Sequence, residues 1–401
     1  MLDRTANHSA HGFSVLAWPA PAAAQINPYI SLVYSQFEQA GIEVKPFRPM
    51  QLGRQTADVF HAHWPEAILW GRLAHTLPLL AKVAADHVIK AMDEVRDNGG
   101  RVAWTVHNLV PHAVHPTHQA IWDGFFPAFR QRVDLMIGMT ERSLDLACDA
   151  YPDLASRSRV VIPHPHFRTA YPPPPKMTTA REKLGLPEDS FVVGMLGSVR
   201  ASKGVPQAIS AFCDAQIVNT MLDTMEMLLV AGDCVSESES RKIEQAIGDN
   251  TGVIYRKAPL SPADLVESFA AVDAILINQQ TTLNSGTLLL ALSMNRPVIA
   301  PAGGSIGELA KEFGRKWIFT FSGELTAQKL RNFMDQIKRT PHPRIAPLEK
   351  LDPAKVSRTT IAALSGARAL RRPQEPHYAF SGARPDKIRA HGGGGADRRY
   401  R

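Results

Sequence analysis

Short apolar runs alternate along the chain with longer stretches in which apolar residues recur every three or four positions. A short apolar run between polar residues predicts a buried strand, and the three-to-four spacing predicts an amphipathic helix. The first half predicts strands at residues 13–18, 59–63, 101–107, 135–139 and 160–162, with helices at 30–40 and in a long stretch ending at Asp97. The second half predicts strands at residues 191–199, 227–231, 253–255, 274–277 and 297–300. This alternation is typical of parallel α/β sheets.

Prolines separate the two halves. The segment 162–176 holds Pro163, Pro165 and the proline run 172–175. Because proline has a fixed φ and no N–H, neither a helix nor a central strand can contain this run, and it predicts a stiff connector. Two α/β domains joined in this way predict a cleft, with ligands at the carboxyl ends of the strands. The predicted organisation is an N-terminal domain at 1–165, a linker at 166–176, a second domain at 177–350, and a C-terminal helix with a flexible basic tail at 351–401.

Composition indicates a globular protein and argues against a nucleic-acid partner. A chain of 401 residues is long enough for two domains, and 44% apolar with 21% charged residues exclude a disordered or fibrous protein. The net charge is +7, but residues 371–401 hold eight Lys/Arg against three Asp/Glu, so the rest of the chain is nearly neutral. We give the basic tail no role beyond weak attraction to anionic surfaces.

Cysteine usage and hydropathy indicate the compartment. Cys148, Cys213 and Cys234 are widely spaced and match neither a disulfide framework nor a zinc pattern, so we expect free thiols. The N-terminus lacks the basic and apolar regions of a signal peptide. No apolar stretch reaches the about 20 residues that span a bilayer. The expected location is cytoplasmic, with peripheral contact with the inner face of the membrane left open.

Basic and small residues gather where the first strand of the second half ends, in the segment Gly197-Ser198-Val-Arg200-Ala-Ser-Lys203-Gly204. Two cations three positions apart can bind a pyrophosphate, and small residues let main-chain N–H groups approach the anion. A solvated basic loop is the alternative interpretation.

A second anion site is expected before the apolar helix at 288–294. The segment Asn284-Ser285-Gly286-Thr287 precedes this helix. A helix N-terminus presents free N–H groups and a partial positive charge.

These segments, in their order and spacing, resemble the donor domain of GT-B glycosyltransferases, most closely family 4 and related bacterial exopolysaccharide transferases of the β-mannosyl or glucosyl type. The resemblance implies an α/β, GT-B architecture, in which two Rossmann-like domains with parallel sheets face each other across an interdomain cleft. The matching segments lie at 197–204, 228–233, 258–265 and 285–308, about a third of the chain.

The resemblance also implies roles for residues of the second half. Arg200, Lys203, Gly204, Ser285, Gly286 and Thr287 would bind the donor diphosphate. Gly197, Ser198, Arg256, Ala258, Leu260, Thr282 and Asn284 would lie near the nucleotide base and the sugar. The nucleotide-diphosphate sugar is then a co-substrate, and neither a cofactor nor a metal is expected, because cationic side chains and helix ends offset the charge of the leaving diphosphate.

One departure concerns the reaction's stereochemistry. Family 4 members usually carry two glutamates eight positions apart around this helix start, and Thr282 and Leu290 occupy those positions here. A retaining mechanism of the family's kind therefore lacks its carboxylates. The amino-acid sequence of the helix segment resembles that of transferases that form β-mannosides, which favours an inverting reaction.

Histidines mark strand ends in the first half. His61 and His63 alternate on one strand and so point to one side, Glu66 follows just beyond it, and His107-Asn108 end another strand. These resemble acceptor-domain motifs in which a histidine faces the cleft. An inverting transfer needs a base within hydrogen-bond reach of the acceptor hydroxyl. Glu66 is the first candidate for that base, His107 the second, and His63 could orient either one. A structural corner at Glu66 and a loop-bonded His107 remain alternatives.

The acceptor side includes further candidates. Asn27, Tyr29 and Asn108 are predicted to contact the acceptor, although Asn27 followed by Pro28 serves equally well as a helix cap. The aromatic and basic stretch at 121–132 fits a membrane-facing surface or a core helix with one polar edge. The histidines at 112, 115 and 118 match no tetrahedral spacing, so no zinc site is expected.

The function that these observations support is transfer of a hexose from a GDP-mannose or UDP-glucose type donor to a glycan or lipid-linked acceptor in bacterial polysaccharide or glycolipid synthesis. A nucleotide-sugar epimerase or hydrolase of the same fold is one alternative. A non-catalytic partner subunit is another, motivated by the missing glutamates, although retention of Arg200 and Lys203 argues against it.

Overall fold

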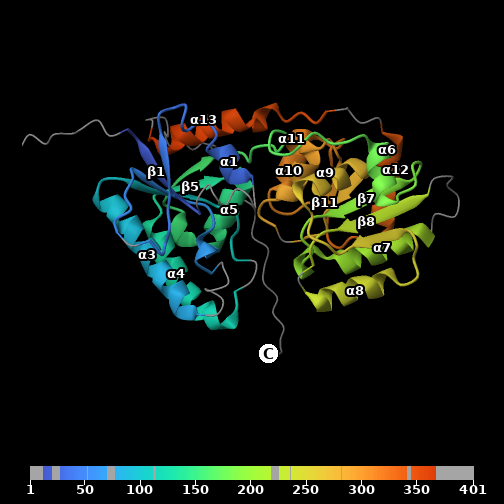
Figure 1. The fold of residues 1–401 in the computed structure, drawn as a ribbon, viewed down its shortest axis with the longest axis horizontal. Coiled ribbons are helices and arrows are strands. Elements are labelled where there is room, and N and C mark those ends of the chain that lie inside the picture. Colours follow the sequence, from blue (N-terminus) through green and yellow to red (C-terminus); the bar gives the residue numbers. More distant parts are fainter. Residues whose placement is uncertain are drawn as a thin grey trace, which may run out of the picture. The chain divides into compact units, whose positions relative to one another are not determined.

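The computed structural model describes residues 12–19, 28–51, 53–69, 77–111, 114–217, 225–234, 236–280, 282–340 and 345–366 (Figure 1). The described residues up to Ser365 form one compact unit. They contain two six-stranded parallel sheets, one in each half of the sequence. Each strand expected from the apolar runs overlaps an observed strand, so the predicted α/β architecture is confirmed.

The first sheet has the strand order β2-β1-β3-β4-β5-β6. Its strands are β1 (Ser14–Trp18), β2 (Glu43–Pro46), β3 (Val59–Ala62), β4 (Arg101–Thr105), β5 (Leu135–Gly138) and β6 (Ser158–Val161). The helices around it are α1 (Tyr29–Val33), α3 (Pro78–Asp97), α4 (Gln119–Arg132), α5 (Glu141–Ala150) and, from the end of the chain, α13 (Pro353–Leu364).

Successive residues of β1 face opposite sides of this sheet, as the two-residue period of a strand requires. Leu16 and Trp18 pack with α3 and α4 on one face, whereas Val15 and Ala17 pack with α1 and α13 on the other. Figure 1 shows α3 and α4 together on their side of the sheet. Both faces are therefore buried, which explains why the strands read as continuous apolar runs.

The second sheet has the strand order β12-β11-β10-β7-β8-β9. Its strands are β7 (Phe191–Leu196), β8 (Glu226–Ala231), β9 (Val253–Arg256), β10 (Ala274–Leu276), β11 (Val298–Pro301) and β12 (Ile318–Phe321). Its helices are α6 (Met177–Leu184), α7 (Val205–Ile217), α8 (Glu237–Ile247), α9 (Pro262–Ala271), α10 (Gly286–Ser293), α11 (Ile306–Phe313) and α12 (Ala327–Arg339).

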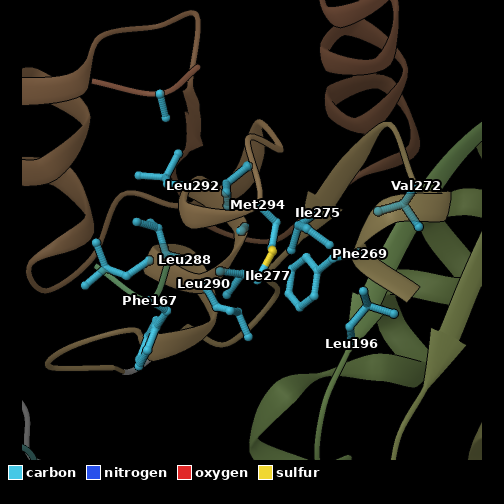
Figure 2. Packing of buried hydrophobic residues seen from close by; sticks show 14 of the residues in the cluster. Phe167, Leu196, Phe269, Val272, Ile275, Ile277, Leu288, Leu290, Leu292 and Met294 are labelled. Carbon is cyan, nitrogen blue, oxygen red and sulfur yellow. The ribbon is translucent and has the colours of Figure 1, made fainter. Parts of the chain in front are cut away.

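Apolar side chains cover both faces of this sheet as well. One face packs against α7, α8 and α12, and the other against α9, α10 and α11. Figure 2 shows the second cluster, in which Leu288, Leu290 and Leu292 of α10 are packed with Phe269 of α9 and Ile275 of β10. The sequence of α10 is apolar all round because this helix is buried.

The structure differs from the sequence predictions at three elements. The helix expected at 30–40 ends at Val33, and the residues after it form turns. The strands β2 and β12 were not predicted. Both are four residues long and lie at the edges of their sheets. The polar sequence of β2 gives no apolar run, whereas β12 (Ile-Phe-Thr-Phe) is an apolar run that the prediction overlooked.

The proline-containing connector is attached to the second half at its start. The His166 N–H donates to Leu351 O at 2.8 Å, and the Phe167 N–H donates to Ser293 Oγ at 2.9 Å. The Phe167 ring packs in the core cluster of α10 (Figure 2). The exact domain boundaries stay predictions, and the basic tail at 367–401 lies outside the described residues.

The close approach of the loops after β7 and β8 gives the first prediction. A Cβ on Gly232 would lie 2.0 Å from Gly197 O, and the φ of Gly232 is +151°. We expect Gly232→Ala to cost about 3 kcal/mol or more, because main-chain atoms must move. The measurement is the shift of the urea unfolding midpoint.

Gly185→Ala is the matched control. Gly185 has φ +64° and ψ +30°, in the left-handed α region, and a Cβ there meets nothing within 4 Å, so the substitution should cost only about 1 kcal/mol of backbone strain. Equal losses in the two variants would contradict the close approach.

Candidate functional site

Each sheet has one point where the strand order reverses, between β1 and β3 in the first sheet and between β7 and β10 in the second. Ligands of open parallel sheets bind beyond the carboxyl ends of the strands at such a point. At the second reversal the loops after β7 and β10 enclose a cavity of about 40 Å³. Its polar lining includes Lys203, Asn278, Gln279, Ser285 and Thr287.

The loop after β7 requires its glycines. Gly197 and Gly204 have φ values of +95° and +58°, in the left-handed region that glycine adopts without strain. A Cβ on Gly204 would lie 2.8 Å from Asn278 Nδ2, which donates to Gly204 O at 2.9 Å. The structure therefore brings the predicted segment 197–204 against the end of β10.

Lys203 is the cation that faces the cavity, and Arg200 precedes it on the exposed side of the same turn. Burial and, to a smaller extent, the positive charge of Arg200 together lower the pKa of Lys203 from 10.5 to about 8. An anion bound beside Lys203 would offset both effects. This arrangement suits a phosphate group.

The N-terminus of α10 lies at the same cavity. The Ser285 Oγ caps the helix by accepting a hydrogen bond from the Leu288 N–H at 3.2 Å. Ser285 and Thr287 line the cavity, and a Cβ on Gly286 would meet nothing within 4 Å, so the main chain there is open to a ligand. The two predicted anion-binding segments therefore meet at one place.

Asn284 connects this loop to the first sheet. Its Nδ2 donates to Val106 O at 3.1 Å and to His107 O at 3.3 Å. Its Oδ1 is buried and has no partner among the described residues. Thr282 Oγ1 donates to Asn284 O at 2.7 Å and so supports the turn. The predicted sugar-contacting residues thus lie beside the strand end that carries His107.

Three other predicted residues lie farther along the second sheet. Arg256 ends β9, and its side chain donates to Leu184 O at 2.9 Å. Ala258 is exposed, and Leu260 packs against the core cluster. None of the three is among the described residues that line the cavity, so their predicted contact with a nucleotide base stays a prediction.

In the first half the structure brings the strand-end histidines together. His61 and His63 are fully buried, and His107 is 8% exposed. The His63 Nδ1 and the His107 Nε2 are 3.3 Å apart. His63, expected to orient either Glu66 or His107, is therefore within hydrogen-bond distance of His107.

Aromatic rings enclose His107. Its ring stacks on Trp64 with the ring centroids 4.1 Å apart, and the edge of Tyr29 lies 4.7 Å away. Burial holds the pKa of His107 well below its usual value, and the nearby His164 and His61 lower it further. His107 is therefore a neutral imidazole, able to accept or donate one hydrogen bond at each nitrogen.

Glu66 lies in the 3₁₀ helix η2 (Pro65–Leu69) directly after β3 and is 8% exposed. Asn108 Nδ2 donates to Glu66 Oε1 at 3.1 Å. Burial raises the pKa of Glu66, and the hydrogen bonds that it accepts limit the rise. A carboxylate with a raised pKa is a stronger base than an exposed one, which fits the predicted role.

Sequence inspection missed three polar residues of these sites. Tyr34 Oη lies 3.0 Å from His63 Nε2, and Asn278 supports the loop after β7. His164 lies 4.8 Å from the Tyr29 ring. Because His164 follows the end of β6, the strand-end criterion that selected His107 could have found it. Asn27, predicted to contact the acceptor, lies outside the described residues.

The aromatic stretch at 121–132 is a core helix. Trp122, Phe125, Phe126 and Phe129 of α4 are buried, and the Arg130 guanidinium lies 4.8 Å from the centre of the Phe126 ring. Its rings therefore fill the first domain's core.

Across the part of the chain that the structure describes, no helix is long and apolar enough to cross a membrane. In the same residues, no group of three or more His, Cys, Asp or Glu side chains could hold a metal ion.

Comparison with known proteins gives distant relatives. No model of a known protein family matches the chain. The chain is 26% identical over 320 residues to the GDP-mannose:glycolipid 4-beta-D-mannosyltransferase of Xanthomonas campestris pv. campestris, a match covering 79% of this chain and 82% of that protein. It is 26% identical over 264 residues to the D-inositol 3-phosphate glycosyltransferase of Acidothermus cellulolyticus, which covers 62% of this chain and 53% of that protein.

Solved structures share the arrangement of the two sheets. HepE of Anabaena in complex with UDP and glucose matches with a TM-score of 0.60 and 16% identity, over 89% of this chain and all of that chain. The trehalose-6-phosphate synthase OtsA matches with a TM-score of 0.58 and 11% identity, over 88% of this chain and 99% of that chain. These likenesses confirm the fold that the donor-segment resemblance implied.

The buried histidines predict loss of stability in acid. Burial lowers the pKa of His61 from 6.5 to about 3 and that of His164 to about 4. The unfolded chain therefore binds protons that the folded chain excludes. The contribution of these neutral histidines to the free energy of unfolding is fully present above pH 6.5. It falls as the pH drops toward 4, by about 1.4 kcal/mol per pH unit for each such histidine. The urea unfolding midpoint, measured from about pH 8 to about pH 4, checks this loss of stability.

His164→Gln should reduce the slope of this dependence, because one buried imidazole is removed. His115→Gln, which changes an exposed ring, should leave the slope as in the wild type. An unfolding midpoint that does not change with pH would contradict the burial of neutral histidines.

Proposed function

We propose that this chain, a glycosyltransferase of the GT-B fold that acts on a nucleotide-sugar donor, transfers mannose from GDP-mannose to a glycolipid acceptor. The relative from Xanthomonas campestris, which aligns over most of both chains, is named for this reaction. UDP-glucose is the second donor to test, since HepE of Anabaena binds UDP and glucose.

The observation that carries the proposal is the junction at Asn284. The loop that opens α10 lines the cavity with Ser285 and Thr287, and the neighbouring Asn284 donates to the main chain of His107. A donor diphosphate beside Lys203 and an acceptor hydroxyl beside the histidines would therefore be close to each other.

In the proposed reaction an acceptor hydroxyl attacks C1 of the sugar while the bond from C1 to the diphosphate breaks. Arg200, Lys203 and the first N–H groups of α10 would stabilise the departing diphosphate, as preorganised donors do for developing charge. Glu66 is the preferred base for the hydroxyl proton, and His107 is the second candidate. We propose that no metal is needed, because these groups already supply positive charge.

Inversion of the anomeric centre is the favoured outcome. Thr282 and Leu290 stand where related enzymes carry two glutamates, and Leu290 is 8% exposed in the apolar cluster of α10 (Figure 2). Neither position supplies a carboxylate. A single displacement that uses Glu66 or His107 needs none there.

The alternatives have less support. An epimerase, a hydrolase or a non-catalytic subunit would keep the fold, but the relatives that align with this chain are named as transferases.

We further propose a cytoplasmic location with peripheral contact with the inner membrane, and a role in exopolysaccharide synthesis, because a glycolipid acceptor would lie at a membrane surface.

Donor binding is tested first by thermal shift with GDP, UDP, ADP and dTDP. We expect GDP to stabilise the wild type, by about 2.7 kcal/mol at ~100 times its dissociation constant. Arg200→Ala/Lys203→Ala should lose this stabilisation because the cations that bind the diphosphate are gone. Lys183→Ala, which removes a surface lysine paired with Glu267, is the control and should bind as the wild type does. No shift with any nucleotide at millimolar concentration would refute donor binding.

The base is tested by isosteric substitution and GDP-mannose turnover. Glu66→Gln should lower kcat by about a hundredfold or more, since general-base catalysis contributes roughly 10²- to 10⁴-fold, and should leave GDP binding unchanged. Because burial raises the pKa of Glu66 above 4.5, activity should rise with pH through that raised pKa. If His107→Gln, and not Glu66→Gln, abolishes turnover, the roles are reversed.

A further inference from the structure

A continuous chain of buried hydrogen bonds leads to His107. The His61 Nε2 lies 2.9 Å from Thr105 Oγ1, and the His61 Nδ1 lies 2.7 Å from Tyr34 Oη. The same Tyr34 oxygen lies 3.0 Å from His63 Nε2, and His63 Nδ1 lies 3.3 Å from His107 Nε2. Among the residues that the structure describes, Tyr34 is therefore the group that joins His61 of β3 to His63, which directly follows this strand.

Burial keeps every member of this chain uncharged. Tyr34 is 8% exposed and Thr105 is 1% exposed, like the fully buried His61 and His63. Burial lowers the pKa of both β3 histidines and raises the pKa of the Tyr34 phenol. Each imidazole then carries one N–H, and the phenol carries one O–H.

These protons can be placed along the chain in only two ways that satisfy every bond. Tyr34 has one proton, so it donates to one histidine of β3 and accepts from the other. If it accepts from His63 Nε2, then His63 Nδ1 is bare and accepts from His107 Nε2. The proton of His107 is then on Nε2, and His107 Nδ1 carries the lone pair. If Tyr34 donates to His63, every bond reverses and His107 carries its proton on Nδ1.

We propose that Tyr34 is a positioning residue that holds His63, and through it His107, in the tautomer whose bare Nδ1 accepts a hydrogen bond from a substrate hydroxyl. The direction rests on the proposed function, because an attacking hydroxyl gives up its proton and needs an acceptor. Tyr34 reaches the substrate only through the two histidines. A hydroxyl carries a single proton, so the proposal applies to the mechanism in which His107, the second candidate base, receives it.

Removing the Tyr34 hydroxyl breaks the chain without changing its charge. In Tyr34→Phe the His63 Nε2 loses its partner, so His63 can move its proton to Nδ1 and donate to His107 Nε2. His107 must then carry its proton on Nδ1, where it cannot accept from a hydroxyl. We expect kcat to fall about ten- to a hundredfold, up to the lower limit of the roughly 10²- to 10⁴-fold effect of general-base catalysis, and KM for the donor to stay within about twofold.

The tautomers are read directly by two-bond proton–nitrogen correlation NMR on protein labelled at histidine, without substrate. The wild type should show His107 with a bare Nδ1, its signals identified by their loss in His107→Gln. Tyr34→Phe should show His107 protonated on Nδ1, wholly or in part. Tyr151→Phe is the control: it also removes a phenol hydroxyl, bonded to Leu109 O, and should change neither kcat nor the His107 signals.

A second variant guards against misfolding of the first. Thr105→Val keeps the shape of the side chain that His61 Nε2 contacts and leaves Tyr34 in place, and it also removes the hydrogen bond between Thr105 and Tyr29. It should move the same His107 signals and lower kcat by a smaller factor. Thermal melting of each variant separates loss of folding from loss of the tautomer.

The outcomes separate the two proposals. A wild type that does not transfer mannose from GDP-mannose refutes the proposed donor, yet the spectra still decide the role of Tyr34. Tyr34 is not a positioning residue if Tyr34→Phe keeps the wild-type His107 signals and kcat. A wild-type His107 with its proton on Nδ1 overturns the proposed direction.

Discussion

In a parallel sheet every strand ends at the same edge, and in each half of this protein the candidate functional residues gather at that edge. The first sheet brings His63 and His107 together beyond β3 and β4, and the second brings Lys203 and Asn278 together beyond β7 and β10. The residues are far apart in sequence, and only the common direction of the strands makes them neighbours. Both sites depend on this one constraint.

Removal from water is the second physical factor common to the two sites, and it has opposite consequences for them. In the first sheet burial keeps the imidazoles neutral, so their hydrogen bonds form a chain that has two possible directions. In the second sheet burial lowers the pKa of Lys203 to about 8, which leaves an ammonium that an incoming anion would stabilise. These properties favour a hydroxyl group beside the histidines of the first sheet and a phosphate group beside Lys203 of the second.

The absence of the glutamate pair becomes understandable in this setting. Leu290 belongs to the apolar packing of α10, and Thr282 supports the turn that positions Asn284. At this helix start, Leu290 therefore packs in the core, and Thr282 supports the contact of Asn284 with the first sheet. In the proposed reaction, Lys203, Arg200 and the α10 N-terminus would stabilise the leaving group, and a residue of the first sheet would remove the proton.

The sequence by itself determined the strands of both sheets, the glycine-flanked cations after β7 and the histidines at the ends of β3 and β4. These features are local: an apolar run, a turn or a strand end is visible within a few residues. The edge strand β2 is polar and gives no apolar pattern, whereas β12 has the buried apolar residues Ile318, Phe319 and Phe321 and was overlooked. Only the tertiary structure decided that Tyr34 joins His61 and His63 and that Asn284 contacts Val106, 178 positions away. Such contacts, and the pKa values that burial sets, depend on how distant elements pack, and no local pattern of residues encodes them.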